Sequence, residues 1–377
     1  MSCHLEKPPK IMHVVLSLNA GGGAERLVFD MVRDPFFAGN PSVVCCLQEV
    51  GALGNQLLAE NFKVFCHAKH ARFDLSMVGW LASIMEEERI DVVHAHQYTP
   101  MFYAVPAAFW AGRKKVVYTE HGRLYPDIRR WKRRLINPLL SLGINHIISI
   151  SEGTKRAMVE VDNFSAQKIN VVHNGMNLAT ADPSFDPVAK RRALGLNETA
   201  RVIGTAARLE EIKNLPMLLR GFQFLLEKHG DTYLLIAGRG SQESALKEYV
   251  RELGIEKRVI FLGLRDDLVE IYPLFEVFLL TSFSEGISIT LLEAMSHGIP
   301  AVVSNVGGNP EVVVEGETGF LVDLNDDTGL AARVMEVLDD RVLAEKLGAK
   351  ARLRAEKAFG FELMIEHYLS YYCDWRS

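Results

Sequence analysis

The sequence predicts an α/β protein of two doubly wound, parallel-sheet domains, and three observations support this class. With 377 residues, of which 48% are apolar, the chain is too long for one ordinary hydrophobic core, so two domains are expected. Short apolar runs alternate with amphipathic segments, as in parallel strands joined by helices. The alternation stops at 174–200, a segment rich in Pro, Asp, Asn and small residues, and then restarts. This segment is therefore the expected linker.

In the first half, a near-continuous apolar run at 11–18 indicates a buried strand, and the glycines at 21–23 provide the turn into a helix at 24–32. The later apolar runs are bounded by turn residues and are short enough to be strands. The expected strands are 43–47, 64–66, 92–94, 116–119, 146–149 and 169–172, and the expected helices between them are 54–61, 75–88 and 100–111.

The second half repeats this pattern, and its tail from residue 330 reads as mostly helical. Ligands of such sheets bind beyond the carboxyl ends of the strands, so we expect the two domains to face each other across a cleft. The expected strands are 202–206, 233–237, 259–262, 277–280 and 301–304, and the expected helices are 215–228 and 243–253.

Composition excludes several classes. A net charge of −5 and a pI of about 6.2 do not suit a nucleic-acid binder. The odd set of five cysteines contains no CxxC pair and favours reduced thiols. The amino-terminal residues contain no apolar signal segment, and no run of about 18 apolar residues exists. We expect a cytoplasmic protein, with the alternative of peripheral binding at the inner face of a membrane.

The segment 284–311 is the most informative part of the chain. Glu285 and Glu293 are separated by seven residues, and Ser284 or Ser288 can cap the helix that carries Glu293. A helix N-terminus has unpaired N–H groups and a partial positive charge, which suit a diphosphate. A carboxylate further along the helix can accept hydrogen bonds from the hydroxyls of a sugar. Together these features indicate a nucleotide-sugar site.

With the following GIPAVVS and GGNPE runs, this segment resembles the glutamate-x7-glutamate motif of retaining glycosyltransferases with the GT-B fold, the large family four (glycosyl transferases group 1). The resemblance covers nearly the whole chain. It implies an acceptor-side domain at 1–180, joined by a C-terminal helix at about 361–377, and a donor domain at 181–360. It also implies a nucleotide diphosphate sugar donor, a glycan or lipid-linked acceptor, and no metal or other cofactor.

The resemblance also implies individual roles. Glu285 would hold sugar hydroxyls and Glu293 the ribose, while Arg208 and Lys213 match the family's arginine-x4-lysine pair, which neutralises the leaving diphosphate. His121, just past a strand end, resembles the family's cleft histidine. The implied catalytic residues are His121, Glu285, Arg208 and Lys213. The implied donor-binding residues are Gly22, Gly23, Arg208, Lys213, Gly238, Leu264, Glu285, Gly286, Ile287, Ser288, Ile289 and Glu293.

Two glycine loops have more than one interpretation. Residues 21–25 (GGGAE) lack the third glycine of a dinucleotide fingerprint, because Arg26 stands in its place, and at 238–240 the fingerprint fails at Glu243. A tight strand-to-helix turn is one interpretation of each loop. The first loop also resembles the family's loop near the donor phosphates, and Gly238, with Gly263 and Leu264, resembles positions around the nucleotide base.

Other polar residues follow expected strands in the first half. His94 and His96 share one face if their strand continues, a spacing that can begin a metal site, although no third or fourth ligand is evident. Lining of the cleft and a structural role are the alternatives, and we expect no metal. Ser151 and Asn174 resemble cleft residues of the family but can equally be a helix cap and a turn.

One basic run stands out, Arg129, Arg130, Trp131, Lys132, Arg133 and Arg134, which apolar residues follow. A basic helix with a tryptophan and an apolar face can lie on an anionic membrane surface, and family members with lipid-linked acceptors often use such a patch. A solvated helix face, or a site for an anionic acceptor, is the alternative interpretation.

We therefore expect a retaining, metal-independent glycosyltransferase of surface polysaccharide or glycolipid biosynthesis. Two rivals remain, a nucleotide-sugar epimerase on the same scaffold and a non-catalytic nucleotide- or sugar-binding protein. The sequence leaves open the donor, because residues 287–290 (ISIT) depart from the commonest family pattern in the donor site. It leaves open the acceptor as well.

Overall fold

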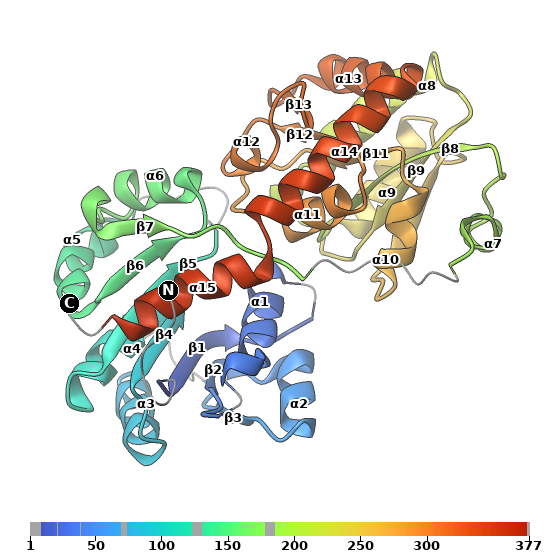
Figure 1. Ribbon diagram of the computed structural model, residues 1–377. Coiled ribbons are helices and arrows are strands. Elements are labelled where there is room, and N and C mark those ends of the chain that lie inside the picture. The colour runs from blue at the N-terminus through green and yellow to red at the C-terminus, as the bar shows by residue number, and fades with distance from the viewer. Residues whose placement is uncertain are drawn as a thin grey trace. The chain divides into compact units, whose positions relative to one another are not determined.

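The computed structural model describes residues 9–20, 22–37, 39–68, 74–122, 130–177 and 185–374. The chain divides into two compact units (Figure 1). Unit 1 comprises Met1–Gly175 and Phe361–Ser377, and unit 2 comprises Met176–Gly360. The predicted boundary at residues 180 and 181 lies outside the described residues; the units divide at Gly175 and Met176.

The described part of unit 1 contains a parallel sheet with the strand order β3-β2-β1-β4-β5-β6-β7. The chain begins at the centre, moves to one edge and returns beside β1, so the topological switch point lies between β1 and β4. The strands are β1 (Ile11–Ser17), β2 (Val43–Glu49), β3 (Lys63–Cys66), β4 (Val92–His96), β5 (Lys115–Glu120), β6 (His146–Ser149) and β7 (Ile169–Val171). The helices are α1 (Gly23–Val32), α2 (Gly51–Ala59), α3 (Ser76–Glu87), α4 (Tyr98–Trp110), α5 (Trp131–Leu140), α6 (Glu152–Glu160) and α15 (Phe361–Cys373).

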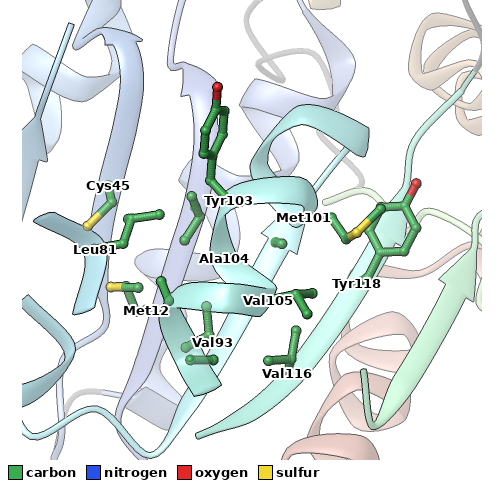
Figure 2. Packing of buried hydrophobic residues seen from close by; sticks show 14 of the residues in the cluster. Met12, Cys45, Leu81, Val93, Met101, Tyr103, Ala104, Val105, Val116 and Tyr118 are labelled. Atoms are coloured by element: carbon green, nitrogen blue, oxygen red, sulfur yellow. The ribbon is translucent and has the colours of Figure 1, made fainter. Parts of the chain in front are cut away.

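The main core of unit 1 lies between one face of this sheet and helices α3 and α4 (Figure 2). Alternate residues of the central strands, such as Met12 and Val93, meet Leu81 of α3 and Ala104 of α4. Strand β4 is buried along its whole length, which explains its uninterrupted apolar and histidine side chains.

Helix α15 covers part of the other face, although unit 2 separates it from the rest of unit 1 in the sequence (Figure 1, red). Its Met364, Tyr368 and Tyr372 pack with Val92 of β4 and Val117 of β5. Both tyrosines are fully buried. The polar side chains on this face of β4 are therefore enclosed by a helix from the far end of the chain.

Unit 2 has a second parallel sheet, with the order β10-β9-β8-β11-β12-β13 and its switch point between β8 and β11. The strands are β8 (Arg201–Ala206), β9 (Thr232–Ala237), β10 (Val259–Gly263), β11 (Val277–Leu280), β12 (Ala301–Ser304) and β13 (Gly319–Val322). The helices are α7 (Pro187–Ala193), α8 (Leu215–Leu226), α9 (Glu243–Glu252), α10 (Leu268–Ile271), α11 (Ile289–Ser296), α12 (Asn309–Val312), α13 (Asp327–Asp339) and α14 (Arg341–Ala358).

The two predicted doubly wound sheets are confirmed, with differences at particular elements. Strand β4 extends through His96, two residues beyond its predicted end. The sequence did not predict β13, α6 or α7. Helix α7 lies inside the expected linker, where the Asp186 side chain accepts hydrogen bonds from the amides of Val188 and Ala189. This aspartate-proline start was a readable signal among the turn-forming residues.

The expectation of reduced thiols holds in part. Cys45, Cys46 and Cys66 are free, and burial raises the pKa of Cys46 to about 12, so its thiolate is disfavoured at neutral pH. Cys373 is disulfide-bonded, so the expectation is wrong at that position. An odd number of cysteines leaves room for one pair, and the count alone could not exclude it.

Candidate active site

Three of the predicted donor residues of unit 2 follow β8 and β11, the two strands on either side of its switch point. Arg208 and Lys213 lie in the loop after β8, which ends in the 3-10 turn η4 (Glu211–Lys213). Glu285 lies in the loop between β11 and α11. Adjacent parallel strands end at the same edge of a sheet, so these loops meet.

Lys213 and Glu285 form an ion pair where the two loops meet. Lys213 Nζ lies 2.6 Å from Glu285 Oε1, and Ser282 Oγ donates to the same oxygen at 2.5 Å. Both side chains are largely buried, with 16% of Lys213 and 8% of Glu285 exposed. The loops are also joined by their backbones, since the Phe283 amide donates to Ile212 O at 2.8 Å. The cation and the carboxylate are thus held in place before any ligand binds.

Gly307 and Gly308, the paired glycines of the sequence motif, contact the backbone of Glu285. The Gly308 amide donates to Glu285 O at 3.1 Å. Gly307 has φ +54°, and a Cβ at this position would lie 2.0 Å from the same carbonyl oxygen. Since no other residue fits so close an approach, the glycine is required for the position of the Glu285 loop.

Helix α11 starts directly after this loop. The Ser288 side chain accepts a hydrogen bond from the Leu291 amide, which makes Ser288 rather than Ser284 the cap. Gly286 and Ile287 are buried beneath the start of the helix, whereas Ile289 is half-buried. The helix therefore starts shortly after Glu285, the partner of Lys213, and a helix N-terminus carries unpaired amides and a partial positive charge.

Glu293 lies in the second turn of α11 and is held by a residue that the sequence did not single out. Tyr272 donates from its hydroxyl to Glu293 Oε2 at 2.6 Å. Tyr272 is fully buried, and burial and the Glu293 carboxylate raise its pKa well above the usual value. No motif surrounds Tyr272 in the sequence, so only the fold places it beside Glu293.

The remaining predicted donor residues lie at the ends of β8, β9 and β10. Arg208 is exposed. The loop after β9 packs against the loop that carries Arg208, because a Cβ on Gly238 would lie 1.9 Å from Ala207 O. The Gly238 amide also donates to Gly263 O, at the end of β10, at 2.7 Å. Leu264 is 59% exposed, an unusual position for a leucine at a strand end and one open to a flat apolar ligand group.

In unit 1, Gly22 is the N-cap of α1, and Gly23 is the first residue of the helix. A Cβ on Gly22 would lie 1.9 Å from Glu25 Oε2, so the side chain of Glu25 folds back over this turn. Gly21 lies outside the described residues. Gly22 and Gly23 lead from the loop after β1 into α1.

The histidines of unit 1 form one connected group across β1, β4 and β5. His13 and His94 are directly paired in the sheet, and His96 follows on the same face of β4. His13 Nδ1 lies 3.0 Å from His96 Nε2, and His96 Nδ1 lies 2.8 Å from Nε2 of His121, which follows β5. Burial lowers the pKa of His13 to about 3 and that of His121 to about 4. These imidazoles are therefore neutral at pH 7.

His94 is bound within the same group but points to α15. Its Nδ1 lies 2.6 Å from the Tyr372 hydroxyl, and its Nε2 lies 2.8 Å from Thr119 Oγ1. His13 supplies the third histidine that the sequence did not reveal, and nitrogens of His13, His94 and His96 lie within 4.8 Å of one another. Both nitrogens of His94 already have partners, and this set includes no carboxylate to balance a cation.

Ser151 and Asn174 differ in what they do. Ser151 caps α6, with its Oγ accepting from the Thr154 amide at 3.0 Å, so the capping alternative describes it. Asn174 is buried beside His121, and its side chain opposes the effect of burial on the pKa of that histidine. Asn174 Oδ1 and His121 Nδ1 each lack a well-formed hydrogen bond to the described protein groups.

The basic run coincides with the start of α5, although Arg129 lies outside the described residues. Arg133 stacks on Tyr98 with its guanidinium 3.8 Å from the ring centroid, and Arg134 donates to Glu160 O at 2.7 Å. The apolar residues on either side of these two arginines point outward: Trp131 is 67% exposed and Leu135 72%. Arg130 and Lys132 are exposed beside Trp131. Among the described helices, none is both long and apolar enough to span a membrane.

Comparisons with known proteins agree with this architecture. The model of glycosyltransferase family 4 matches residues 21–180, and that of glycosyl transferases group 1 matches residues 188–354. The chain is 26% identical over 331 residues to N-acetyl-alpha-D-glucosaminyl L-malate synthase of Bacillus anthracis, covering 85% of this chain and 83% of the relative. It is 29% identical over 278 residues to an Escherichia coli UDP-Gal:alpha-D-GlcNAc-diphosphoundecaprenol alpha-1,3-galactosyltransferase, covering 72% of each.

Solved structures share the fold over nearly the whole length. A glycosyltransferase from Rickettsia africae superposes with a TM-score of 0.85 at 21% identity, covering 99% of this chain and 100% of the other. Anabaena HepE in complex with UDP superposes with a TM-score of 0.83 at 23% identity, covering 96% and 99%. With two matching family models in sequence order and a shared two-sheet fold, the chain belongs to the GT-B glycosyltransferases of glycosyl transferases group 1.

Proposed function

We propose that the chain transfers a sugar from a nucleotide diphosphate sugar to a hydroxyl of a glycan or lipid-linked acceptor, with retention of the anomeric configuration. The pathway would be surface polysaccharide or glycolipid biosynthesis. The single observation that carries this proposal is the buried Lys213–Glu285 pair at the start of α11. A fixed cation, unpaired helix amides and a carboxylate together suit a sugar diphosphate.

Each group has a distinct role in this proposal. Lys213, Arg208 and the first amides of α11 hold the diphosphate, Glu285 and Ser282 orient the sugar hydroxyls, and Glu293 binds the ribose. Gly238, Gly263 and Leu264 lie at the strand ends where the base would stack. His121, which follows β5, is the proposed catalytic histidine.

In the proposed reaction the bond between the anomeric carbon and the leaving phosphate oxygen breaks as the acceptor oxygen bonds to the same face of that carbon. The acceptor proton passes to the departing phosphate, so no protein nucleophile is needed. This mechanism differs from that of retaining hydrolases, which reach the same stereochemical outcome with a carboxylate nucleophile. The charge that develops on the diphosphate is stabilised by Lys213, Arg208 and helix amides, and we propose that no metal is required.

Product analysis distinguishes this reaction from its rivals. A retaining transferase gives an acceptor product with the donor's anomeric configuration, measurable by the proton coupling constant at the anomeric carbon, and keeps its rate in excess EDTA. An epimerase alters the donor without an acceptor, and a binding protein changes neither. Inversion, or complete loss of activity with the chelator, would contradict the proposal.

The donor is identified by thermal shift against UDP, GDP, ADP and their sugars. The Escherichia coli relative that uses UDP-Gal and HepE in complex with UDP-glucose support UDP-glucose as the first ligand to try. At 100 times its dissociation constant, a ligand adds about 2.7 kcal/mol to the free energy of unfolding. We expect stabilisation by one nucleotide class and its loss in Glu293→Ala. A Glu276→Ala variant, which changes a carboxylate of the same unit outside the proposed site, should keep it.

We further propose that α5 binds an anionic membrane surface. Trp131, Leu135 and Leu139 point outward on one side of this helix, with exposed Arg130 and Lys132 beside them. Burial of each large apolar side chain contributes about 2 kcal/mol, and each nearby cation about 1 kcal/mol on an anionic surface.

Co-sedimentation with phosphatidylglycerol vesicles tests the membrane proposal. The double variant Trp131→Glu and Leu135→Glu should lower the bound fraction at least tenfold, while Leu353→Glu, an exposed leucine of α14, should leave it unchanged. Equal binding of the wild type and the double variant, or binding unaffected by replacing phosphatidylglycerol with phosphatidylcholine, would overturn this part of the proposal.

A further inference from the structure

Three histidines of unit 1 are joined end to end by hydrogen bonds that cross adjacent strands. The connected atoms are His13 Nδ1 with His96 Nε2, at 3.0 Å, and His96 Nδ1 with His121 Nε2, at 2.8 Å. Neighbouring rings in this relay are nearly parallel, with interplanar angles of 22° for each pair. His13 and His96 are buried, whereas His121 is half-buried at the carboxyl edge of the sheet.

Neutral imidazole carries one N–H, so each ring donates from one nitrogen and accepts at the other. All three rings are neutral at pH 7, because burial lowers the pKa of each. The three rings therefore carry three N–H protons: two lie in the inter-ring hydrogen bonds, and the third lies at one end of the histidine relay. The whole relay has two orientations, which differ in the end that carries the third proton.

The surroundings of the two ends decide between these orientations. His13 Nε2 is buried and has no hydrogen-bond partner among the described residues. His121 Nδ1 lies beside the Asn174 side chain, whose Oδ1 is an acceptor that also lacks a well-formed bond. A proton on His13 would be an orphaned donor and would leave His121 Nδ1 and Asn174 Oδ1 as two unsatisfied acceptors. The favoured orientation places the N–H on His121 Nδ1.

We propose that His13 and His96 are positioning residues that hold His121 as its Nδ1–H tautomer. The His121 N–H is then directed to Asn174 Oδ1, the acceptor beside it, so the tautomer and the orientation of the ring are fixed together. This inference rests on the proposed function for its kinetic consequence, but the tautomer is a property of the protein alone.

Helix α15 contacts the histidine group through His94, which hydrogen-bonds to Tyr372 of this helix and to Thr119 of β5. These contacts use both nitrogens of His94 and none of the relay atoms. His94 therefore offers a matched control, a buried histidine of the same strand that is not a member of the relay.

Two-dimensional ¹H–¹⁵N spectra of histidine ring nitrogens in the full-length protein test the tautomer directly. The His121 signals, assigned with a His121→Asn variant, should show a protonated Nδ1 and an unprotonated Nε2. His96→Phe should abolish this preference, because Nε2 loses its donor. His94→Gln should leave it unchanged. Protonation at Nε2 in the wild type, or an unchanged pattern in His96→Phe, would overturn the proposal.

Kinetics with UDP-glucose as donor provide the second readout. We expect His96→Phe to lower kcat/KM about tenfold, the effect of one lost hydrogen bond. His96→Gln should recover activity to within about threefold, because a carboxamide can accept from His13 and donate to His121. This variant also serves if His96→Phe does not fold. Absence of turnover in the wild type would count against the proposed function, while the spectra still decide the relay.

Discussion

Replacing Lys213 with alanine is expected to lower kcat by about 10²- to 10³-fold, the usual loss when one group that stabilises developing charge is removed. Lys213 Nζ lies 2.6 Å from Glu285 Oε1 and is mostly buried, so water cannot easily substitute for it. The variant also leaves Glu285 with Ser282 but without its cation. The expected measurement is the initial rate of sugar transfer at saturating donor.

Part of the loss could come from stability, so unfolding must be measured alongside activity. An orphaned, largely buried carboxylate should lower the free energy of unfolding by about 1–3 kcal/mol, which leaves the variant folded under assay conditions. Lys247→Ala is the matched control, since this lysine pairs with Glu243 at 2.6 Å on an exposed helix face. It should change stability by less than about 0.5 kcal/mol and leave kcat unchanged.

A rate for Lys213→Ala within threefold of the wild type would remove Lys213 from the machinery and weaken the assignment of Glu285. A loss equal in Lys213→Ala and Lys247→Ala would point to general destabilisation instead. The contrast between these two lysines, both in ion pairs of the same unit, separates a role in the reaction from a role in folding.

Acidification is expected to unfold unit 1 before unit 2. Burial lowers the pKa of His13 to about 3 and of His121 to about 4, and it also lowers the pKa values of His94, His96 and His146. In the unfolded chain these histidines titrate near pH 6.5, so below that pH the unfolded state binds more protons. Stability is therefore constant above about pH 7 and falls as the pH drops towards the folded pKa values.

The expected slope is large. Each histidine whose pKa stays low in the folded state costs about 1.4 kcal/mol per pH unit below pH 6, so His13, His94, His96 and His121 cost about 5.5 kcal/mol per pH unit together. With the ordinary stability of a domain, unit 1 should unfold between about pH 6 and pH 4.5. Above about pH 5.5 few carboxylates are protonated, so the first part of the transition belongs to the histidines.

Fluorescence measures this transition selectively, because the four tryptophans (Trp80, Trp110, Trp131 and Trp375) all belong to unit 1. Far-ultraviolet circular dichroism follows both units. We expect the fluorescence transition to precede the loss of the remaining helix. A His13→Asn variant should reduce the slope by about 1.4 kcal/mol per pH unit. Unchanged fluorescence from pH 7 to pH 4.5 would contradict the prediction.

The sequence predicted the fold well where the elements were long or purely apolar. Strands β11 (VFLL) and β12 (AVVS) begin and end at the predicted residues, and each contains a continuous apolar run. Strand β13 has only four residues, GFLV, between polar loops, and such a run has no distinctive period. Its identity as a strand depends on pairing with β12, which is a tertiary effect.

The candidate site divides in the same way. Glu285, Glu293, Arg208 and Lys213 were visible because their spacing is a local pattern in the chain. Tyr272 was not, because nothing near it in the sequence indicates the carboxylate that it contacts. Ser282 lies close to Glu285 in the chain, but a serine at that spacing is no distinctive pattern. His13 lies in an apolar strand, where a lone histidine carries no signal. It joins His96 only when β1 and β4 pair.

Unit 1 consists of two separate parts of the chain, and this affects the order in which the protein can fold during synthesis. Its sheet is complete by Gly175, but α15, which covers Val92 and Val117 and binds His94, is synthesised only after the whole of unit 2. On the ribosome, unit 2 can finish folding while the first sheet still exposes its apolar face. A nascent chain halted before Phe361 would therefore present a folded unit 2 beside an open sheet, a natural target for chaperones.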